Sequence, residues 1–467
     1  MPQAASPAHP HRRLILFTSC LGAFMATLDT SIVNVALPQI SQDFHATLGQ
    51  VSWVIQIYLL LNASFLLTSG RLGDLLPPGK VYLLGLVVFT GASALCGFST
   101  GLAWMVAARA LQGLGASLML GLAPKLIASV YGEGERGLAL GLFSTAFATG
   151  ISVGAPLGGL ITAYLGWPYI FFINIPICTL ALGLGGRSLR RLPAPGPWDR
   201  RAFDLWGGLA LAGSLGFLIL GLSGLKAAGS LDGGNWGKMA LALGLFVFLI
   251  FLERRHPAPL LHPDLWRTRP FILGSLAVVL NFSAVMGVFF LLPFFLEQGY
   301  HYSPGHTGLM LAALSLTNGL VAPVGGYLAD RFGNMTILRT GTAIVALGLG
   351  SLIFTGPEAT TPGLAARLAL IGLGFGLFQA PNLNEVLRGI NPSLLGVAAG
   401  TNAVLKNLGA LLGITLMVTV FAWLNLGEIC LAPGVCLELS AFQSAFAVAA
   451  GVAAVNFLVN LMPRGKI

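Results

Sequence analysis

Charged side chains are scarce in this sequence. Asp, Glu, Lys and Arg make up 9% of the 467 residues, whereas 55% of the residues are hydrophobic. A soluble domain carries about 25% charged residues, so the composition argues against a single water-soluble core. Segments of roughly 20 apolar residues match the thickness of a lipid bilayer. The sequence therefore predicts an integral membrane protein.

The chain also has few residues of the kinds that catalyse reactions or hold cofactors. Its 5 Cys and 7 His residues form no metal-ligand cluster. No G-x-x-x-x-G-K-[ST] segment occurs, which argues against ATP-driven pumping. The string GFSTG at 97–101 matches G-x-S-x-G, but it lies in a turn between two apolar segments and not in the strand-turn-helix setting of hydrolases. We expect no enzyme activity, metal or cofactor.

Long apolar runs are abundant, and charged or Gly/Pro-rich breaks divide them into fourteen predicted spans. The fold class is thus predicted to be all-α, with each span a membrane helix. The spans cover residues 14–38, 51–70, 81–99, 101–124, 138–163, 167–187, 205–225, 237–252, 271–296, 307–328, 335–355, 364–386, 394–424 and 440–462.

The basic residues predict the orientation of these spans, because cytoplasmic loops retain Lys and Arg. With the N-terminus inside, 20 of the 25 basic residues fall on the inner side, and only Lys226, Lys238 and Arg367 fall outside. Both termini are expected in the cytoplasm. This asymmetry and anionic lipid headgroups account for the net charge of +9, so we expect no nucleic acid partner.

Two cysteines lie close together in the predicted outer loop before the last span. Cys430 is the first and Cys436 the last residue of the string CLAPGVC. They could form a disulfide in an oxidising compartment, and the sequence leaves open whether they do.

Two short strings indicate an internal repeat. GRLGD at 70–74 follows the second span and GYLAD at 326–330 follows the tenth, both at the predicted inner face. Similar sequences at matching places in the topology suggest two related bundles of six spans. We therefore expect an N-terminal six-helix bundle over 1–190, two inserted transmembrane helices over 191–265 and a C-terminal six-helix bundle over 266–467.

Several motifs together resemble those of one family. GRLGD with Lys80 is similar to the loop signature of the major facilitator superfamily, RALQGLGA at 109–116 to its fourth-span signature, and GISVGAPLGG at 150–159 to its antiporter motif. With LDTSIVNVALP at 28–38, GWPYIFFINIP at 166–176 and fourteen spans, the chain resembles the 14-span drug:proton antiporter branch. This resemblance implies the two-bundle fold and transport by alternating access.

Asp29 and Arg109 are charged residues inside apolar spans. At a rise of about 1.5 Å per residue, they lie roughly 22 and 18 Å from the inner surface of a core about 30 Å thick. A single charge at the bilayer centre costs about 2.5 to 3.5 kcal/mol on insertion scales, so we expect the two to pair. The pair could be a permanent salt bridge, or Asp29 could alternate between protonated and ionised forms. The resemblance implies the second role, proton coupling.

Lys406 comes to a similar depth in the thirteenth span, within NAVLKNLGALLG, where the family usually has an arginine. It could balance a helix end or hold an anionic group of a substrate. Asp29 is expected to be the only carboxylate deep in the spans, and this weakens the case for a dedicated organic-cation pump.

Uncharged polar residues within the spans complete the candidate substrate site. For each of them, an interhelical hydrogen bond and a substrate contact are alternative roles. Besides Lys406, the candidates are Asn34, Gln56, Gln112, Asn281, Asn318, Gln379, Asn382 and Asn402. Gln379 and Asn382 flank Pro381, and this grouping predicts a broken helix.

Glycine spacing in the fifth span provides candidate gating residues. Gly150, Gly154 and Gly158 repeat every four residues and form one stripe, which lets another helix approach closely. The stripe could serve packing alone. With Pro156, it could instead be the bending and sliding surface of alternating access.

Charges in the predicted inner loops are further gating candidates. Asp74 and Lys80 follow the second span, and Asp330 and Arg331 follow the tenth. The two carboxylates are expected to act as latches, because helix N-termini nearby could hold them when the inner side is closed.

The favoured interpretation is a proton-coupled antiporter in the bacterial cytoplasmic membrane, which exports drug-like or lipophilic small molecules and is expected to be a monomer. Its partners would be the substrate, protons and the lipid bilayer. One alternative is export of a specific anionic or zwitterionic metabolite, which Lys406 and the scarcity of acids favour. A membrane enzyme or lipid-handling protein should show catalytic side chains at one interface, and none is visible.

Overall fold

The computed structural model describes residues 11–192, 204–222, 233–255, 263–356, 358–391, 394–425 and 436–463. The described part is entirely helical apart from turns and connections. It contains 14 helical segments that are long and apolar enough to cross a membrane. The predicted fold class and number of spans are therefore confirmed.

Fifteen α-helices are described, and α6 and α7 together make the sixth span. Their bounds are α1 Arg12–Asp43, α2 Leu48–Leu75, α3 Pro78–Gly97, α4 Leu102–Val130, α5 Glu133–Tyr164, α6 Pro168–Phe172, α7 Asn174–Arg190, α8 Leu205–Leu222, α9 Gly233–Arg255, α10 Arg269–Phe294, α11 Pro304–Phe332, α12 Asn334–Ile353, α13 Thr361–Leu387, α14 Leu395–Asn425 and α15 Cys436–Leu461. A 3-10 turn, η2 (Pro263–Arg267), precedes α10, and a π turn, η3 (Phe295–Gly299), follows it.

We call the end of the molecule where α1 begins the inner end, after its predicted orientation, and the opposite end the outer end. Three helices that begin at the outer end have side-chain caps. Thr47 and Gln50 form a capping box at α2, while Ser303 and Thr360 accept hydrogen bonds from the first turns of α11 and α13. Such caps satisfy backbone N–H groups that have no partner within the helix, so they fix where these spans begin.

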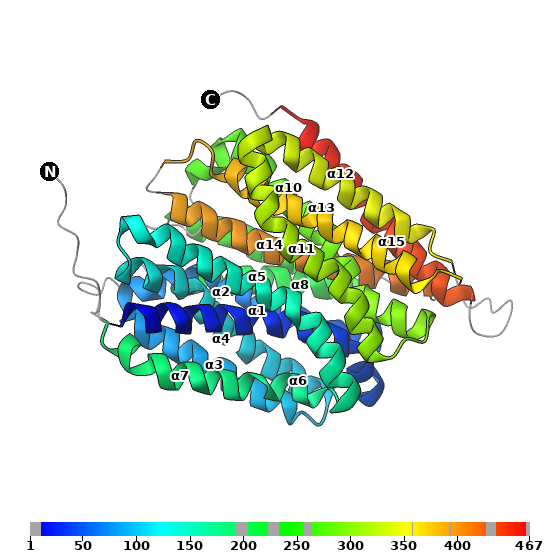
Figure 1. The fold of residues 1–467 in the computed structure, drawn as a ribbon, viewed down its shortest axis with the longest axis horizontal. Helices are drawn as coiled ribbons and strands as arrows, with labels where there is room; N and C mark the ends of the chain where they lie inside the picture. The colour runs from blue at the N-terminus through cyan, green and yellow to red at the C-terminus, as the bar shows by residue number, and fades with distance from the viewer. Residues whose placement is uncertain are drawn as a thin grey trace.

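The helices form two groups with matching internal contacts. In the first group α1 packs against α5 and α4, and both α2 and α3 pack against α4. In the second, α10 packs against α14 and α13, and both α11 and α12 pack against α13. Figure 1 shows α1, α3, α4, α6 and α7 on one side of the molecule, α10, α12, α13 and α15 on the other, and α5, α11 and α14 between them.

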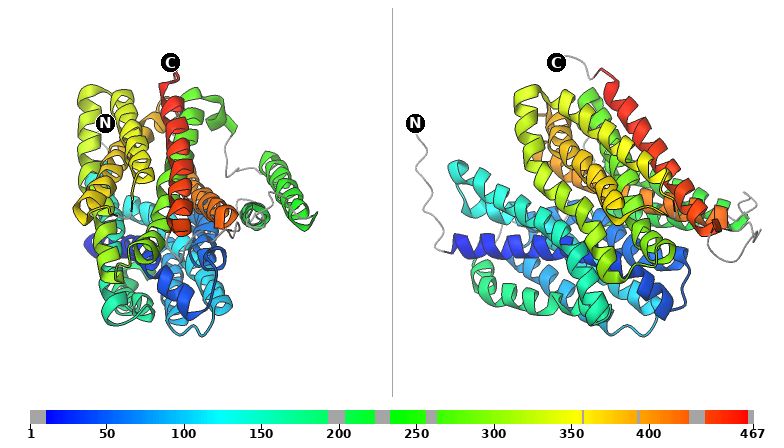
Figure 2. Two further views of the ribbon diagram at one scale, coloured as in Figure 1. Left: turned by 90° about the vertical axis from the view of Figure 1, so that its right-hand side faces the viewer. Right: turned by 45° about the vertical axis from the view of Figure 1, so that its right-hand side comes forward.

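The two inserted helices lie at the margin of this arrangement. Helix α8 packs against α9 and against α2, and Figure 2 shows the pair beside the main body. The domain boundaries near 190 and 265 stay predictions, since residues 193–203 and 256–262 lie outside the described part. Cys430 and the side chain of Cys436 are also outside it.

The two groups meet along α5 and α11, and also along α2 and α14. Ser152 and Ser315 each donate a side-chain hydrogen bond to the other's backbone carbonyl, at 3.0 and 3.2 Å. Nearer the outer end, a Cβ built on Gly159 would lie 2.8 Å from the Cα of Gly308, and one built on Gly308 would lie 2.7 Å from the carbonyl oxygen of Ala155. We call this contact between residues 152–159 and 304–319 the seam.

Toward the inner end, α5 and α11 are no longer covered by one another. Between residues 134 and 149 of α5, only Ala139 is buried, and between residues 320 and 332 of α11 only Gly325 and Ala329 are buried. The two groups of helices diverge at this end in Figure 2. Along α5 and α11, the structure is thus closed at the outer end and parted at the inner end.

The structure differs from the sequence-based prediction of a broken helix at Pro381. Helix α13 continues through Pro381 to Leu387, so the predicted break is wrong. A proline removes one backbone hydrogen bond, but neighbouring helices can hold a membrane helix together. The sixth span is interrupted instead, at Ile173 between α6 and α7.

The glycine stripe of α5 packs against α1 and not against the other group of helices. A Cβ on Gly154 would lie 2.6 Å from the Cβ of Ser31, and one on Gly158 would lie 2.8 Å from the carbonyl oxygen of Ile32. The expected close approach of another helix is therefore present, and the proposed role of the stripe in gating stays a prediction.

Gly154→Ala is expected to destabilise the protein by about 1 to 3 kcal/mol, because the added methyl group overpacks the contact between α1 and α5. Thermal unfolding in detergent measures this change. Gly141→Ala on the same helix is the control, because nothing lies within 4 Å of its Cβ position. Equal unfolding temperatures for the two variants would contradict the packing role of the stripe.

Candidate functional site

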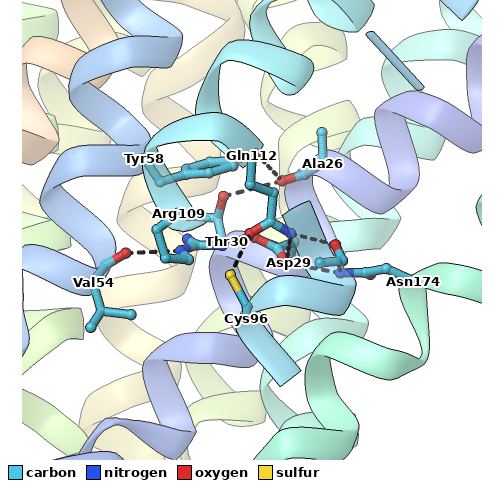
Figure 3. A network of polar contacts seen from close by, with 10 residues as sticks. Ala26, Asp29, Thr30, Val54, Tyr58, Cys96, Arg109, Gln112 and Asn174 are labelled. Atoms are coloured by element: carbon cyan, nitrogen blue, oxygen red, sulfur yellow. Dashed lines mark hydrogen bonds and ion pairs between the residues drawn. The ribbon is translucent and has the colours of Figure 1, made fainter. Parts of the chain in front are cut away.

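The structure pairs Asp29 with Arg109, as the sequence predicts. Nη1 of Arg109 donates a hydrogen bond to Oδ2 of Asp29, and both side chains are completely buried. Figure 3 shows them pointing toward one another from α1 and α4. Each residue therefore supplies the counter-charge that the other needs away from water.

The second oxygen of Asp29 is held by two amides. Oδ1 accepts hydrogen bonds from Nε2 of Gln112, at 2.8 Å, and from Nδ2 of Asn174, at 3.0 Å. Both amide nitrogens also lie within hydrogen-bond distance of Oγ of Ser93, at 2.7 and 3.0 Å. Helices α3, α4 and α7 thus meet around the carboxylate of α1 (Figure 3).

Arg109 has contacts of its own with α2 and with Gln112. Its Nε donates to the carbonyl oxygen of Val54 at 2.8 Å, and its Nη1 also donates to Oε1 of Gln112 at 2.6 Å. The guanidinium lies 4.3 Å from the centre of the Tyr58 ring, a cation–π contact. Nη2 of Arg109 is buried and has no hydrogen-bond partner in the described part of the chain.

We call Asp29, Arg109, Gln112, Asn174 and Ser93 the buried network. A proton arriving at Asp29 would neutralise the carboxylate and leave Arg109 without its counter-charge. Loss of one partner of a buried pair typically costs about 3 to 5 kcal/mol. Protonation of Asp29 would therefore weaken the contacts that hold the surrounding helices together.

The sequence-based prediction missed two members of the network and assigned a third to another role. Asn174 lies within the quoted motif GWPYIFFINIP, so a signal for it was present. Ser93 has no distinctive local pattern. Gln112 was predicted to contact substrate, whereas it bonds to both Asp29 and Arg109.

The other predicted polar residues are spread over both halves of the molecule. Most bond to another helix: Asn34 donates to the carbonyl oxygen of Phe289, Gln56 accepts from Thr415, Gln379 donates to Asn318, and Asn382 donates to the carbonyl oxygen of Gly274. Asn281 is fully buried with neither amide atom bonded among the described residues, and Oδ1 of Asn402 is likewise unpartnered. Their predicted role in substrate binding stays a prediction.

Lys406 lies in the second half, away from the buried network. Its ammonium group is 5.6 Å from the centre of the Phe282 ring, and Phe282 packs edge-on against Phe375 at 5.0 Å. Lys406 belongs to none of the salt bridges resolved between described residues. It is thus a cation beside aromatic rings without a carboxylate partner in the described part.

The predicted latch residues all lie at the inner end. Asp74 pairs with Lys125 of α4, which also donates to the carbonyl oxygen of Gly73 at 2.6 Å. This partner is a side chain in the same half, and the expected contact with a helix N-terminus when the inner end is closed stays a prediction. Lys80, Asp330 and Arg331 are exposed. Pro156 lies inside α5 without ending it.

Asp29 is the only carboxylate near the middle of a described span, but other buried carboxylates lie at span ends. Glu385 is 2% exposed near the end of α13, where it lines a surface pocket with Asn334 and Arg388. Oε1 of Glu297 is buried in η3. Among the described residues, no group of three or more His, Cys, Asp or Glu side chains could hold a metal ion.

Comparison with known proteins gives one consistent family. The family model described as Major Facilitator Superfamily matches residues 19–414. A solved structure of a bacterial homologue of the human drug peptide transporters PepT1 and PepT2 matches with a TM-score of 0.66 and 16% identity, covering 96% of this chain and 97% of that one. At this identity the match shows the fold alone.

Three curated relatives cover most of the chain. The riboflavin transporter RibZ of Clostridioides difficile (strain 630) is 31% identical over 415 residues, 88% of each protein. The cephamycin export protein CmcT of Amycolatopsis lactamdurans is 32% identical over 87% of this chain and 84% of that protein. The tetracenomycin C resistance and export protein of Streptomyces glaucescens is 30% identical over 87% and 75%. This chain therefore belongs to the major facilitator superfamily and is a transporter, not an enzyme.

Proposed function

We propose that this transporter is a proton-coupled antiporter that exports drug-like or lipophilic small molecules by alternating access. The observation that carries the proposal is the buried pair of Asp29 and Arg109, within a network drawn from four spans. A structural salt bridge would suffice to hold two helices. A carboxylate enclosed together with its counter-ion is also the kind of group whose protonation can be coupled to a conformational change.

The proposed cycle follows from the charges. With the inner end parted, as in this structure, Asp29 is paired with Arg109 and substrate enters from the cytoplasm. After the change to an outward-open state, a proton from the outer medium binds Asp29 and releases Arg109, while substrate leaves. Return to the inward-open state lets the proton leave to the cytoplasm and the pair form again.

The relatives support export of small organic molecules. Two of the three described above are named for export, of cephamycin and of tetracenomycin C. The third is named a riboflavin transporter. We propose localisation in the bacterial cytoplasmic membrane with both termini in the cytoplasm, on the distribution of basic residues, and a monomer as the working unit.

A second candidate is export of a specific anionic or zwitterionic metabolite. Lys406 favours it, because an ammonium group beside Phe282 and Phe375 offers both a charge and aromatic surface to a substrate. Arg109 is already committed to Asp29. Lys406 is therefore the cation that we propose for an anionic substrate group.

Asp29→Asn is expected to abolish substrate flux driven by a pH gradient in proteoliposomes, because an amide cannot take up and release the proton. Exchange of labelled for unlabelled substrate without a gradient should persist, since it requires no net proton transfer. Riboflavin, cephamycin and tetracenomycin C are suitable first probes, with a pH-sensitive dye reporting proton movement.

The matched control is Glu135→Gln, which neutralises the exposed carboxylate at the start of α5 that pairs with Arg12. This variant should keep flux driven by the gradient. Full pH-driven flux in a folded Asp29→Asn protein would show that Asp29 is not the proton carrier.

Lys406→Gln is expected to weaken binding of an aromatic carboxylate more than binding of its uncharged methyl ester. Loss of a charged hydrogen bond costs about 1.5 to 3 kcal/mol, or roughly ten- to more than a hundredfold in affinity. Calorimetric titration of the purified transporter measures both ligands, with Lys238→Gln as the control at an exposed lysine of α9. An equal loss of affinity for the acid and the ester would show that Lys406 does not recognise the charge of the substrate.

A further inference from the structure

Glu297 is an acidic side chain that the proposed proton cycle does not use. It lies in η3, the π turn that ends the span of α10 at its outer end. Its Oε1 is buried and has no hydrogen-bond partner in the described part of the chain. An ionised carboxylate in such surroundings is costly unless it is paired.

The turn around Glu297 contacts three helices, α10, α11 and α15. Thr307 of α11 lies beside the Glu297 carboxyl, and its hydroxyl is buried. Phe295 in the same turn packs on Phe442 and Phe446 of α15, with ring centres 5.4 and 5.1 Å apart. Aromatic contacts therefore hold the turn against α15, while the carboxyl group lies beside a hydroxyl group of α11.

Thr307 connects this place to the seam. It is fully buried, and it directly precedes Gly308, which meets Gly159 and Ala155 of α5. Separating α5 from α11 at the outer end would admit water next to Thr307 and then to Glu297. The surroundings of Glu297 are thus expected to differ between the closed and open states of the outer end.

Few other titratable groups surround Glu297. Residues 281–294 of α10 and residues 440–463 of α15 include no acidic or basic side chain. On α11 the nearby group is His306, which is exposed, as is His301 in the connection. Tyr300 donates its hydroxyl to the carbonyl oxygen of Gly356, and Tyr302 bonds to Thr361. Arg367 of α13 lies within electrostatic range of Tyr300 and donates to Oγ1 of Thr355. None of the salt bridges resolved between described residues includes Glu297, so no cation there is paired with its carboxylate.

We propose that Glu297 is a second proton-binding group, which couples closure of the outer end to uptake of a proton from the outer medium. On closure, an O–H bond forms between a proton of the medium and the carboxylate, and the neutral acid is buried beside Thr307. On opening, water solvates the group, the O–H bond breaks and the proton returns to the same medium. The inference rests on the proposed alternating access but requires no proton transfer at Asp29.

The direction of the pH effect follows from this difference in bound protons. The closed state binds one proton more than the open state, so acidification of the outer medium favours closure. The ratio of closed to open molecules should rise by up to tenfold for each unit of pH decrease, and should level off when Glu297 is protonated in both states.

Spin labels at the outer ends of α5 and α11 test the proposal. Tyr164 and Leu309 are both exposed, so cysteines at these two positions can carry labels in a variant without native cysteines, reconstituted in nanodiscs. The distance distribution is measured against pH. In the otherwise native chain, the short-distance population should grow as the pH falls. Glu297→Gln should give a high and pH-independent short-distance population, because an amide can be buried without a proton.

Two comparisons separate this proposal from the one at Asp29. Asp29→Asn should lose flux driven by a pH gradient but keep the pH dependence of the distance, whereas Glu135→Gln should keep both. If Glu297→Gln retains the pH dependence of the native chain, the inference is wrong, and proton coupling at Asp29 is untouched. If Glu297→Gln does not fold, Glu297→Asp is tested instead. Its shorter side chain moves the carboxylate, so the pH midpoint of the change in distance must shift. An unchanged midpoint would overturn the proposal.

Discussion

A charge in the middle of a bilayer has no water to solvate it, and the first half of this transporter is organised around that constraint. Asp29 and Arg109 pair with one another, and the second oxygen of Asp29 accepts hydrogen bonds from Gln112 and Asn174, which also contact Ser93. Because these side chains come from α1, α3, α4 and α7, the same bonds that stabilise the charges also fix how four helices pack. The second half has no such pair among its described residues, and there Lys406 rests against an aromatic ring.

Much of the fold could be predicted because the bilayer imposes simple rules. Apolar runs gave fourteen spans, and the expected depths of Asp29 and Arg109 were close enough to predict their pairing, which the structure contains. The role of Pro381 was misjudged, since packing by neighbours outweighs one lost backbone bond. Ser93 could not be predicted, because a serine in a span usually bonds its own helix, and only the tertiary fold brings it to Asn174. The partner of Asp74 likewise depends on helix packing.

The location of the buried network limits how the transporter can use it. All its helices belong to the same half, so a rigid rocking of one half against the other leaves the bond between Asp29 and Arg109 intact. Opening the pair requires a movement inside that half or the arrival of a proton. Asn174 is the first residue of α7 after the interruption at Ile173. The interruption of the sixth span therefore lies next to the side chain that bonds Asp29.

The crossing of α5 and α11 has a consequence for the history of substitutions in this chain. Gly159 and Gly308 meet backbone to backbone, and neither residue can become smaller. If a larger residue replaces one of these glycines, no smaller residue can replace the other to make room. At a contact between two large side chains, such a compensation is available. Compensating changes for a substitution at this crossing would have to arise at a distance, through the tilt of whole helices.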